Sequence, residues 1–153
     1  MRLPHRWTRS SPHTASTELV AALNDYRTAI AALAVAGLLL VIQLIVADLT
    51  AIKSRHKAGY PIPADSSRFI FRSARAHANT NESIAAFGLL TIAAILLSAS
   101  PGWTNTLAAA WLASRLAHMG FYYANMKAPR STSFGMSLLI LLGMFVNLAS
   151  SFV

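Results

Sequence analysis

Long stretches without charged residues dominate the chain and predict membrane-length helices. Uncharged runs cover residues 28–47, 83–114, 116–126 and 131–153, and apolar side chains prevail in them. A helix needs about 20 predominantly apolar residues to cross the hydrocarbon core of a bilayer, which is roughly 30 Å thick. We therefore expect an all-α membrane protein, a four-transmembrane-helix bundle with helices at residues 25–52, 67–98, 103–125 and 132–152.

Polar segments separate these helices and divide the chain. Residues 1–20 carry three arginines between prolines and predict a basic disordered tail. The prolines of residues 59–65 interrupt the helical pattern after the first span, and Pro101 followed by glycine ends the second. Residues 127–130 predict a short basic turn before the last span. We expect residues 21–153 to form one four-helix membrane domain.

Composition and charge agree with this prediction. The chain is 55% hydrophobic and only 12% charged, whereas a soluble domain is about 25% charged. A net charge of +8 in a soluble protein would suggest a nucleic-acid partner. Here most basic residues flank apolar runs, where cations meet lipid headgroups, so we expect no nucleic-acid partner. The chain has no cysteine, which excludes disulfides, thiolate metal sites and a cysteine nucleophile.

A polar stripe follows the second predicted helix. At about 100° per residue, Arg68, Arg72, Arg75, Asn79 and Glu82 fall on one side of it. An arginine facing lipid costs about 2.5 to 3.5 kcal/mol on insertion scales, so this stripe must face protein or a polar crevice. Two arginines suit a carboxylate, and the glutamate suits an ammonium. The stripe predicts a site for a small zwitterion, although Arg68 also fits an interfacial anchor and Arg75–Glu82 a structural ion pair.

The third predicted helix presents a complementary face. Trp111, Arg115, His118 and Tyr122 are spaced four, three and four residues apart, so they lie on one side of this helix. An arginine in mid-span needs a carboxylate partner, and Glu82 or Asp48 could supply it. We expect a structural Arg115–Glu82 ion pair. Tyr122 also fits an interfacial aromatic residue. His118 has no metal-ligating companion at helical spacing, so we expect no metal.

The segment from Arg75 to Glu82 carries a recognisable motif. Arg75, His77, Asn79 and Glu82 fill the pattern Arg-x-Gln/His-x-Asn-x-x-Glu. With this motif the chain resembles the MAPEG family, the membrane-associated proteins in eicosanoid and glutathione metabolism, over residues 25–153. Two further segments are similar to the family's third-helix tyrosine and downstream arginine, namely Arg115-x-x-His-x-x-x-Tyr122 and Pro129-Arg130-Ser131.

The resemblance implies a homotrimer that binds glutathione, as co-substrate, between neighbouring subunits. Carried over by residue, one subunit would bind glutathione through Arg75, Asn79, Glu82 and Tyr122, and the next through Arg55 and His77. Arg72 and His118 complete the candidate contacts. His77 lies about 140° to 160° around the helix from the Arg75–Glu82 stripe, which favours contributions from two subunits; it also fits a polar residue at a helix contact.

The resemblance further implies that Arg130 is catalytic, as the arginine beside the glutathione sulfur, with Lys127 as a rival. The implied activity is that of a membrane glutathione transferase or peroxidase. A thiolate stabilised by arginine attacks a lipid-soluble, hydrophobic electrophile from the bilayer, in a detoxification role. Two positions depart from the eukaryotic enzymes: Ser83 follows the motif where tyrosine is common, and His118 stands where a tyrosine often contacts the ligand.

Two other functions remain open from the residues. One is a non-catalytic MAPEG-like protein that binds lipid or a partner. The other is a small transporter or channel subunit, which the absence of an inverted repeat or broken helix disfavours. The alanine-rich, short-looped chain favours a bacterial member of the family. We therefore expect a multi-pass protein of the bacterial inner membrane rather than of the endoplasmic reticulum.

Overall fold

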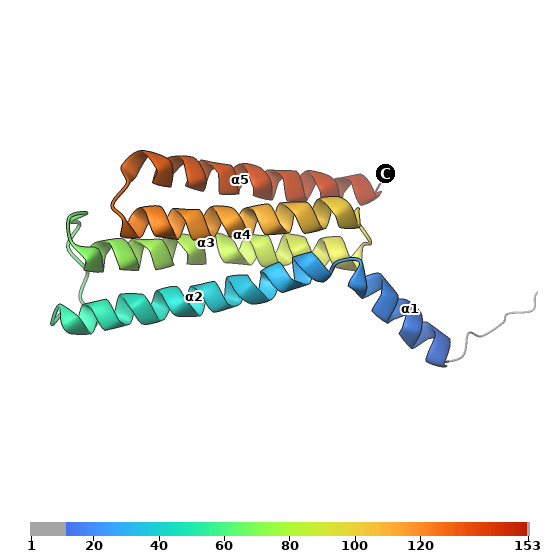
Figure 1. The fold of residues 1–153 in the computed structure, drawn as a ribbon, viewed down its shortest axis with the longest axis horizontal. Coiled ribbons are helices and arrows are strands. Elements are labelled where there is room, and N and C mark those ends of the chain that lie inside the picture. Colours follow the sequence, from blue (N-terminus) through green and yellow to red (C-terminus); the bar gives the residue numbers. More distant parts are fainter. Residues whose placement is uncertain (1–11, 153) are drawn as a thin grey trace, which may run out of the picture.

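The computed structural model describes the backbone of residues 12–152 and the side chains of residues 16–152. Within these residues the chain is entirely helical, with no strand (Figure 1). Its elements are α1 (Pro12–Asn24), α2 (Arg27–Lys53), α3 (Phe69–Leu96), α4 (Pro101–Tyr123), α5 (Lys127–Ala149) and a short 3-10 helix (Ser150–Phe152).

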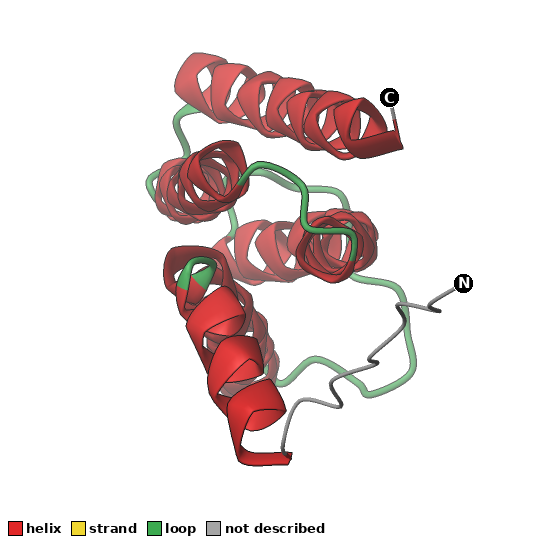
Figure 2. Cartoon of the chain, turned by 90° about the vertical axis from the view of Figure 1, so that its right-hand side faces the viewer, coloured by secondary structure: helices red, strands yellow, loops and turns green. Residues whose placement is uncertain are grey.

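Helices α2 to α5 lie side by side as an up-and-down bundle. Helices α3 and α4 each pack against the other three long helices, whereas α2 and α5 lie on opposite sides of this central pair (Figure 2). Helix α1 diverges from the bundle at the N-terminal end of α2 (Figure 1). The α2–α3 and α4–α5 connections therefore lie at one end of the bundle, and the α1–α2 break and the α3–α4 turn lie at the other.

Three described helices are long and apolar enough to cross a membrane by length and composition. They are α2, α3 and the segment Lys127–Phe152. The expectation of four such spans is not confirmed by this measure, because α4 does not qualify although it has 23 residues. The physical reason is its polar interior face, which buries Thr104, Arg115 and His118.

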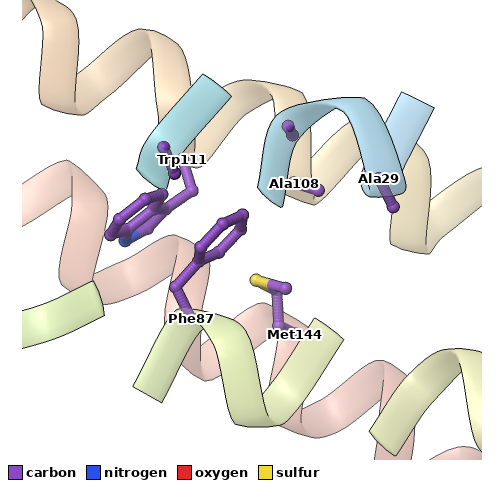
Figure 3. Close-up of a cluster of buried hydrophobic side chains, with 7 residues drawn as sticks. Ala29, Phe87, Ala108, Trp111 and Met144 are labelled. Carbon is purple, nitrogen blue, oxygen red and sulfur yellow. The ribbon is translucent and has the colours of Figure 1, made fainter. Parts of the chain in front are cut away.

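The buried residues of α2 and α4 recur at alternating spacings of three and four, as in a heptad pattern. Helix α2 buries Ala29, Ala32, Ala36, Leu39 and Gln43, and α4 buries a row of the same period from Thr104 to Tyr122. Small residues such as these alanines let membrane helices approach closely. At the centre, the rings of Phe87 and Trp111 stack with centroids 4.0 Å apart and planes 6° apart (Figure 3).

Three of the long helices end in the same way. After α2, α3 and α4 the next residue but one adopts a left-handed backbone, at Arg55 (φ 51°), Ser98 (φ 53°) and Asn125 (φ 58°). In each case the following amide bonds back into the last turn, as His56 N–H does to the Ala51 carbonyl at 3.0 Å. This is the Schellman arrangement, in which glycine is usual, so Arg55 and Ser98 occupy strained positions.

The N-terminal region differs from the predicted disordered tail. Residues 12–24 form α1, whereas residues 1–11 lie outside the described part of the chain. A break at Asp25–Tyr26 separates α1 from α2. The side chain of Asn105, on α4, hydrogen-bonds backbone groups on both sides of this break. The Asn105 amide donates to the Asp25 carbonyl (2.7 Å), and its oxygen accepts the Ala29 N–H (2.9 Å). Asn105 thereby caps α2 from another helix.

The basic segment before the last helix is also helical rather than a turn. Helix α5 begins at Lys127, five residues earlier than expected, and includes Pro129 in its first turn. Proline is tolerated there because the first-turn amides have no acceptor within the helix. Arg130 therefore has its direction fixed by a helix instead of a loop.

Candidate functional site

A small pocket joins three helices at the end of the bundle where α4 leads into α5. Its volume is about 180 Å³, and it is lined by Asn79 of α3, His118 and Tyr122 of α4, and Arg130, Ser131 and Phe134 of α5. The Arg130 guanidinium carbon lies 4.4 Å from the centre of the Tyr122 ring, in cation–π geometry. The His118 ring meets Tyr122 edge-on at 5.1 Å. A cation, an imidazole, an amide and a phenol thus share one cavity.

Arg115 lies deeper in the bundle, beside the pocket amide. Its guanidinium is fully buried and donates to Asn79 Oδ1 (2.9 Å), Thr80 Oγ1 (3.3 Å) and Ser137 Oγ (3.3 Å). The expected Arg115–Glu82 ion pair does not form among the described residues. Glu82 is exposed on α3, because the helix turns Thr80 and Ser83 inward instead. Neutral oxygens, not a carboxylate, hold this charge.

Several predicted site residues lie outside the pocket. Arg75 and Glu82 are exposed on α3, where they flank the half-buried Asn79. His77 is half-buried, and its Nδ1 atom is buried without a hydrogen-bond partner in the described structure. Arg55 is exposed beyond the end of α2. One copy of the chain therefore does not bring the full predicted set together.

Arg72 has a structural task within the chain. Its Nη1 atom donates to the carbonyl oxygens of Ser66 (2.9 Å) and Ser67 (2.6 Å), and the guanidinium lies 5.4 Å from the centre of the Phe69 ring. These bonds fix the loop that enters α3. The Nε atom of Arg72 is buried without a hydrogen-bond partner among the described residues.

Positive charge gathers at this end of the bundle. A second hollow of about 530 Å³, between the end of α2 and the start of α3, is lined by Lys53 and Arg68 among others. Within the α2–α3 loop, Asp65 accepts hydrogen bonds from the Ser67 hydroxyl (2.6 Å) and amide (2.9 Å). These bonds hold the pKa of the Asp65 carboxyl below its ordinary value. The surroundings favour an anionic ligand.

Sequence reasoning missed four residues of the site. Ser131 and Phe134 line the pocket, and Thr80 and Ser137 hold Arg115. For the first two a signal existed, because Phe134 lies four positions after Arg130 and Ser131 three positions before Phe134, spacings that bring side chains together on a helix. It was hidden by the prediction of a turn at this segment. Thr80 and Ser137 gave no signal, since buried hydroxyl residues are common in membrane helices.

The rival residue Lys127 is separated from the pocket. It is exposed in the first turn of α5 and does not line the cavity, whereas Arg130 is half-buried against Tyr122. Among the described residues no group of three histidine or acidic side chains could hold a metal ion. The chemistry available in the pocket is that of cationic and neutral hydrogen-bond donors.

Fold and site together define a class of protein. Three helices of membrane length, a fourth helix with a polar interior face, and a cationic pocket at one end describe an integral membrane protein with a polar pocket. The model of the MAPEG family matches residues 28–150, which is most of the chain, and the chain belongs to this family. The match confirms the resemblance found in the sequence. No curated protein matches the chain by sequence. MAPEG proteins include glutathione transferases and also members without enzymatic activity.

Proposed function

We propose that this protein is a membrane glutathione transferase or peroxidase that acts on hydrophobic electrophiles. The observation that carries the proposal is the shared pocket of Asn79, His118, Tyr122 and Arg130. It joins three predicted binding residues, from two helices, with the predicted catalytic arginine. Membership of the MAPEG family supports the same reading.

Arg130 would activate the thiol. A free thiol has a pKa of about 8.5 and is mostly protonated at neutral pH. Lowering that pKa by two units requires about 2.7 kcal/mol of preferential stabilisation of the thiolate. A guanidinium in a half-buried pocket is suited to this, because it cannot lose its own proton and packs against an apolar ring. The protein then needs no nucleophile of its own, in keeping with the absence of cysteine.

The reaction follows from a bound thiolate. With an electrophilic carbon, a sulfur–carbon bond forms while the leaving group departs with its electron pair, or a double bond takes up the pair and later a proton. With a hydroperoxide, the sulfur attacks the terminal oxygen, the O–O bond breaks and an alcohol leaves. A second glutathione then reduces the resulting sulfenic acid and forms the disulfide. Either substrate would approach from the apolar surface.

We further propose that a homotrimer completes the site. The pocket of about 180 Å³ is smaller than the roughly 300 to 1,000 Å³ of small-molecule pockets, so it would hold only part of a tripeptide. Glu82 is exposed halfway along α3, where contact with lipid would be costly. Packing against a second copy would cover Glu82 and Arg75 and enlarge the pocket. Arg55 and His77 would then serve the neighbouring subunit's ligand.

The test compares two cations that lie three residues apart. Purified protein in detergent receives millimolar glutathione at neutral pH, and the ultraviolet difference absorbance of the thiolate is recorded. Arg130→Ala is measured beside Lys127→Ala, which removes an exposed cation from the same helix turn. Calorimetry on the same samples gives the affinity for glutathione. The oligomeric state is measured by analytical ultracentrifugation.

We expect a thiolate signal that Lys127→Ala keeps and Arg130→Ala loses, with glutathione affinity changed little in both. Loss of the signal in Lys127→Ala alone would move the catalytic role to that residue. Binding without a thiolate signal in the unmodified protein would support the alternative function, a non-catalytic protein that binds lipid or a partner. Absence of glutathione binding would refute the proposal.

A further inference from the structure

A third hollow, distinct from the pocket and from the α2–α3 hollow, lies at the opposite end of the bundle, between α1 and α2. Its volume is about 620 Å³, and its lining includes Val20 and Leu23 of α1 and Arg27, Ile30 and Ala34 of α2. Helix α1 leaves the bundle here, at the end closed by the α3–α4 turn (Figure 1). The family match covers residues 28–150 and does not include α1.

The angle between the two helices is fixed by hydrogen bonds. The Tyr26 hydroxyl donates to the Ala99 carbonyl in the α3–α4 turn. On either side of the break, Asn105 bonds the Asp25 carbonyl and the Ala29 amide. Because these bonds tie the break to α4, α1 cannot simply continue the axis of α2. The hydrogen bonds at the junction therefore maintain the hollow between α1 and α2.

Two residues place this junction at the boundary between lipid and water. Arg27 is followed by the uncharged run of residues 28–47, so the hydrocarbon region begins just beyond it. Trp103, 64% exposed, lies in the first turn of α4 at the same end. Tryptophan favours membrane interfaces. Helix α1, with 13 residues or about 20 Å, is too short to span the bilayer and lies in the headgroup region.

The two sides of α1 differ in character. Val20 and Leu23 are exposed to the solvent-accessible hollow and line it. Glu18 is also exposed but does not line it, and at 100° per residue it points about 160° away from Val20. An amphipathic helix at a membrane surface turns its apolar side toward the acyl chains and its charged side toward water. The hollow is thus on the bilayer side of α1.

Charge at this junction favours an anionic occupant. The side chain of Arg27 makes no hydrogen bond or ion pair with any described residue, and Arg27 is among the residues that line the hollow. The sequence before α1 adds Arg2, Arg6 and Arg9, and residues 1–17 contain no Asp or Glu. We propose that the α1–α2 hollow binds an anionic phospholipid of the surrounding bilayer. Its phosphate pairs with Arg27, and an acyl chain follows Ile30 and Ala34.

Depth measurement tests the placement of α1. The chain has no cysteine, so Val20→Cys and Glu18→Cys can each carry one environment-sensitive fluorophore. In phosphatidylcholine–phosphatidylglycerol nanodiscs we expect lipid-borne quenchers to reach the Val20 label and iodide to reach the Glu18 label. Equal access of iodide to both labels would overturn the proposal. So would failure of the lipid-borne quenchers to reach the Val20 label, because something other than lipid would then cover it.

Lipid selectivity tests the role of Arg27. Native mass spectrometry counts phosphatidylglycerol and phosphatidylcholine molecules retained by the unmodified protein, by Arg27→Gln and by Lys127→Gln. The last variant removes an exposed cation that lines none of the hollows described, at the other end of the bundle, as a control. We expect Arg27→Gln to weaken phosphatidylglycerol retention about fivefold, the contribution of one surface cation, and Lys127→Gln to leave it unchanged. Equal effects of the two variants, or none in either, would refute the site.

Discussion

Replacing Arg115 with methionine separates what the buried guanidinium does for the pocket from what it does for the fold. Arg115 is fully buried and hydrogen-bonds Asn79, Thr80 and Ser137. The Thr80 and Ser137 hydroxyls also donate to carbonyls in their own helices, at 3.2 and 2.7 Å. These two keep a partner when the guanidinium is removed, and only the Asn79 oxygen loses one.

The change in the free energy of unfolding expected for Arg115→Met follows from two opposing contributions. Hydrogen bonds from a charged donor stabilise by about 1.5 to 3 kcal/mol each, and two of the three here are long, so together they contribute about 4 to 6 kcal/mol. Burying the charge costs several kcal/mol, since no carboxylate among the described residues pairs with it. The two nearly cancel. We therefore expect Arg115→Met to change the free energy of unfolding by no more than about 2 kcal/mol.

Lysine at the same position should be worse than methionine. Its ammonium keeps the cost of a buried charge but is a single point, which cannot bond Asn79 on α3 and Ser137 on α5 as the planar guanidinium does. We expect Arg115→Lys to lose about 2 to 4 kcal/mol, or roughly 4 to 16 °C in Tm. Tryptophan fluorescence during thermal unfolding in detergent measures this directly.

Glutathione affinity should respond differently from stability. Arg115→Met leaves the Asn79 side chain without the bond that orients it, so calorimetry should give an affinity about tenfold weaker for this variant, equal to about 1.4 kcal/mol. In Arg115→Lys the ammonium no longer holds Asn79 in the geometry of the guanidinium, so the affinity should also fall. A Met variant less stable than the Lys variant would refute the account of the buried charge. Unchanged affinity in both would refute the positioning of Asn79 by Arg115.

Three further expectations concern the core, the α1–α2 junction and a loop. Phe87→Ala removes a ring stacked at 4.0 Å on Trp111 and should cost about 3 to 5 kcal/mol, measured as the detergent unfolding midpoint against the conservative Phe87→Leu. Asn105→Ala removes the cap of α2 and should speed amide exchange at the junction, with the thiolate signal unchanged. The Asp65 pKa, measured by NMR titration, should lie below the ordinary value and rise in Ser67→Ala. Since the folded-state pKa is lowered, this loop contact is fully present above the ordinary pKa and is lost as pH falls through the lowered one.

The long helices could be predicted from the sequence because the apolar runs exceed membrane length. The observed α2 and α3 begin and end within two residues of the expected positions. The start of α5 could not be placed, since Pro129 suggests a turn unless one knows that it falls in the first helical turn. The break before α2 could not be predicted either. It depends on Asn105, which accepts a hydrogen bond from the amide of Ala29, 76 residues away in the sequence.

The site was predicted in composition more than in arrangement. Periodicity put Asn79 on one stripe and His118 with Tyr122 on another, and these residues meet in one pocket. Periodicity cannot fix how each helix is rotated against its neighbours. In the structure α3 turns Ser73, Ala76, Thr80 and Ser83 inward, and this rotation puts Glu82 on the surface. The expected ion pair with Arg115 failed for this reason.

The two ends of the bundle differ in the forces that hold them. At the end away from the pocket, neutral side chains join the helices: Tyr26 bonds Ala99, Asn105 bonds the start of α2, and Asn147 bonds Thr104 at 3.0 Å. At the pocket end, cations prevail and have few anionic partners among the described residues. Like charges brought together repel, and a bound anion relieves that repulsion. Hydrogen bonds between neutral side chains can therefore hold the helices together at one end, while the cationic pocket end would gain stability from an anionic ligand.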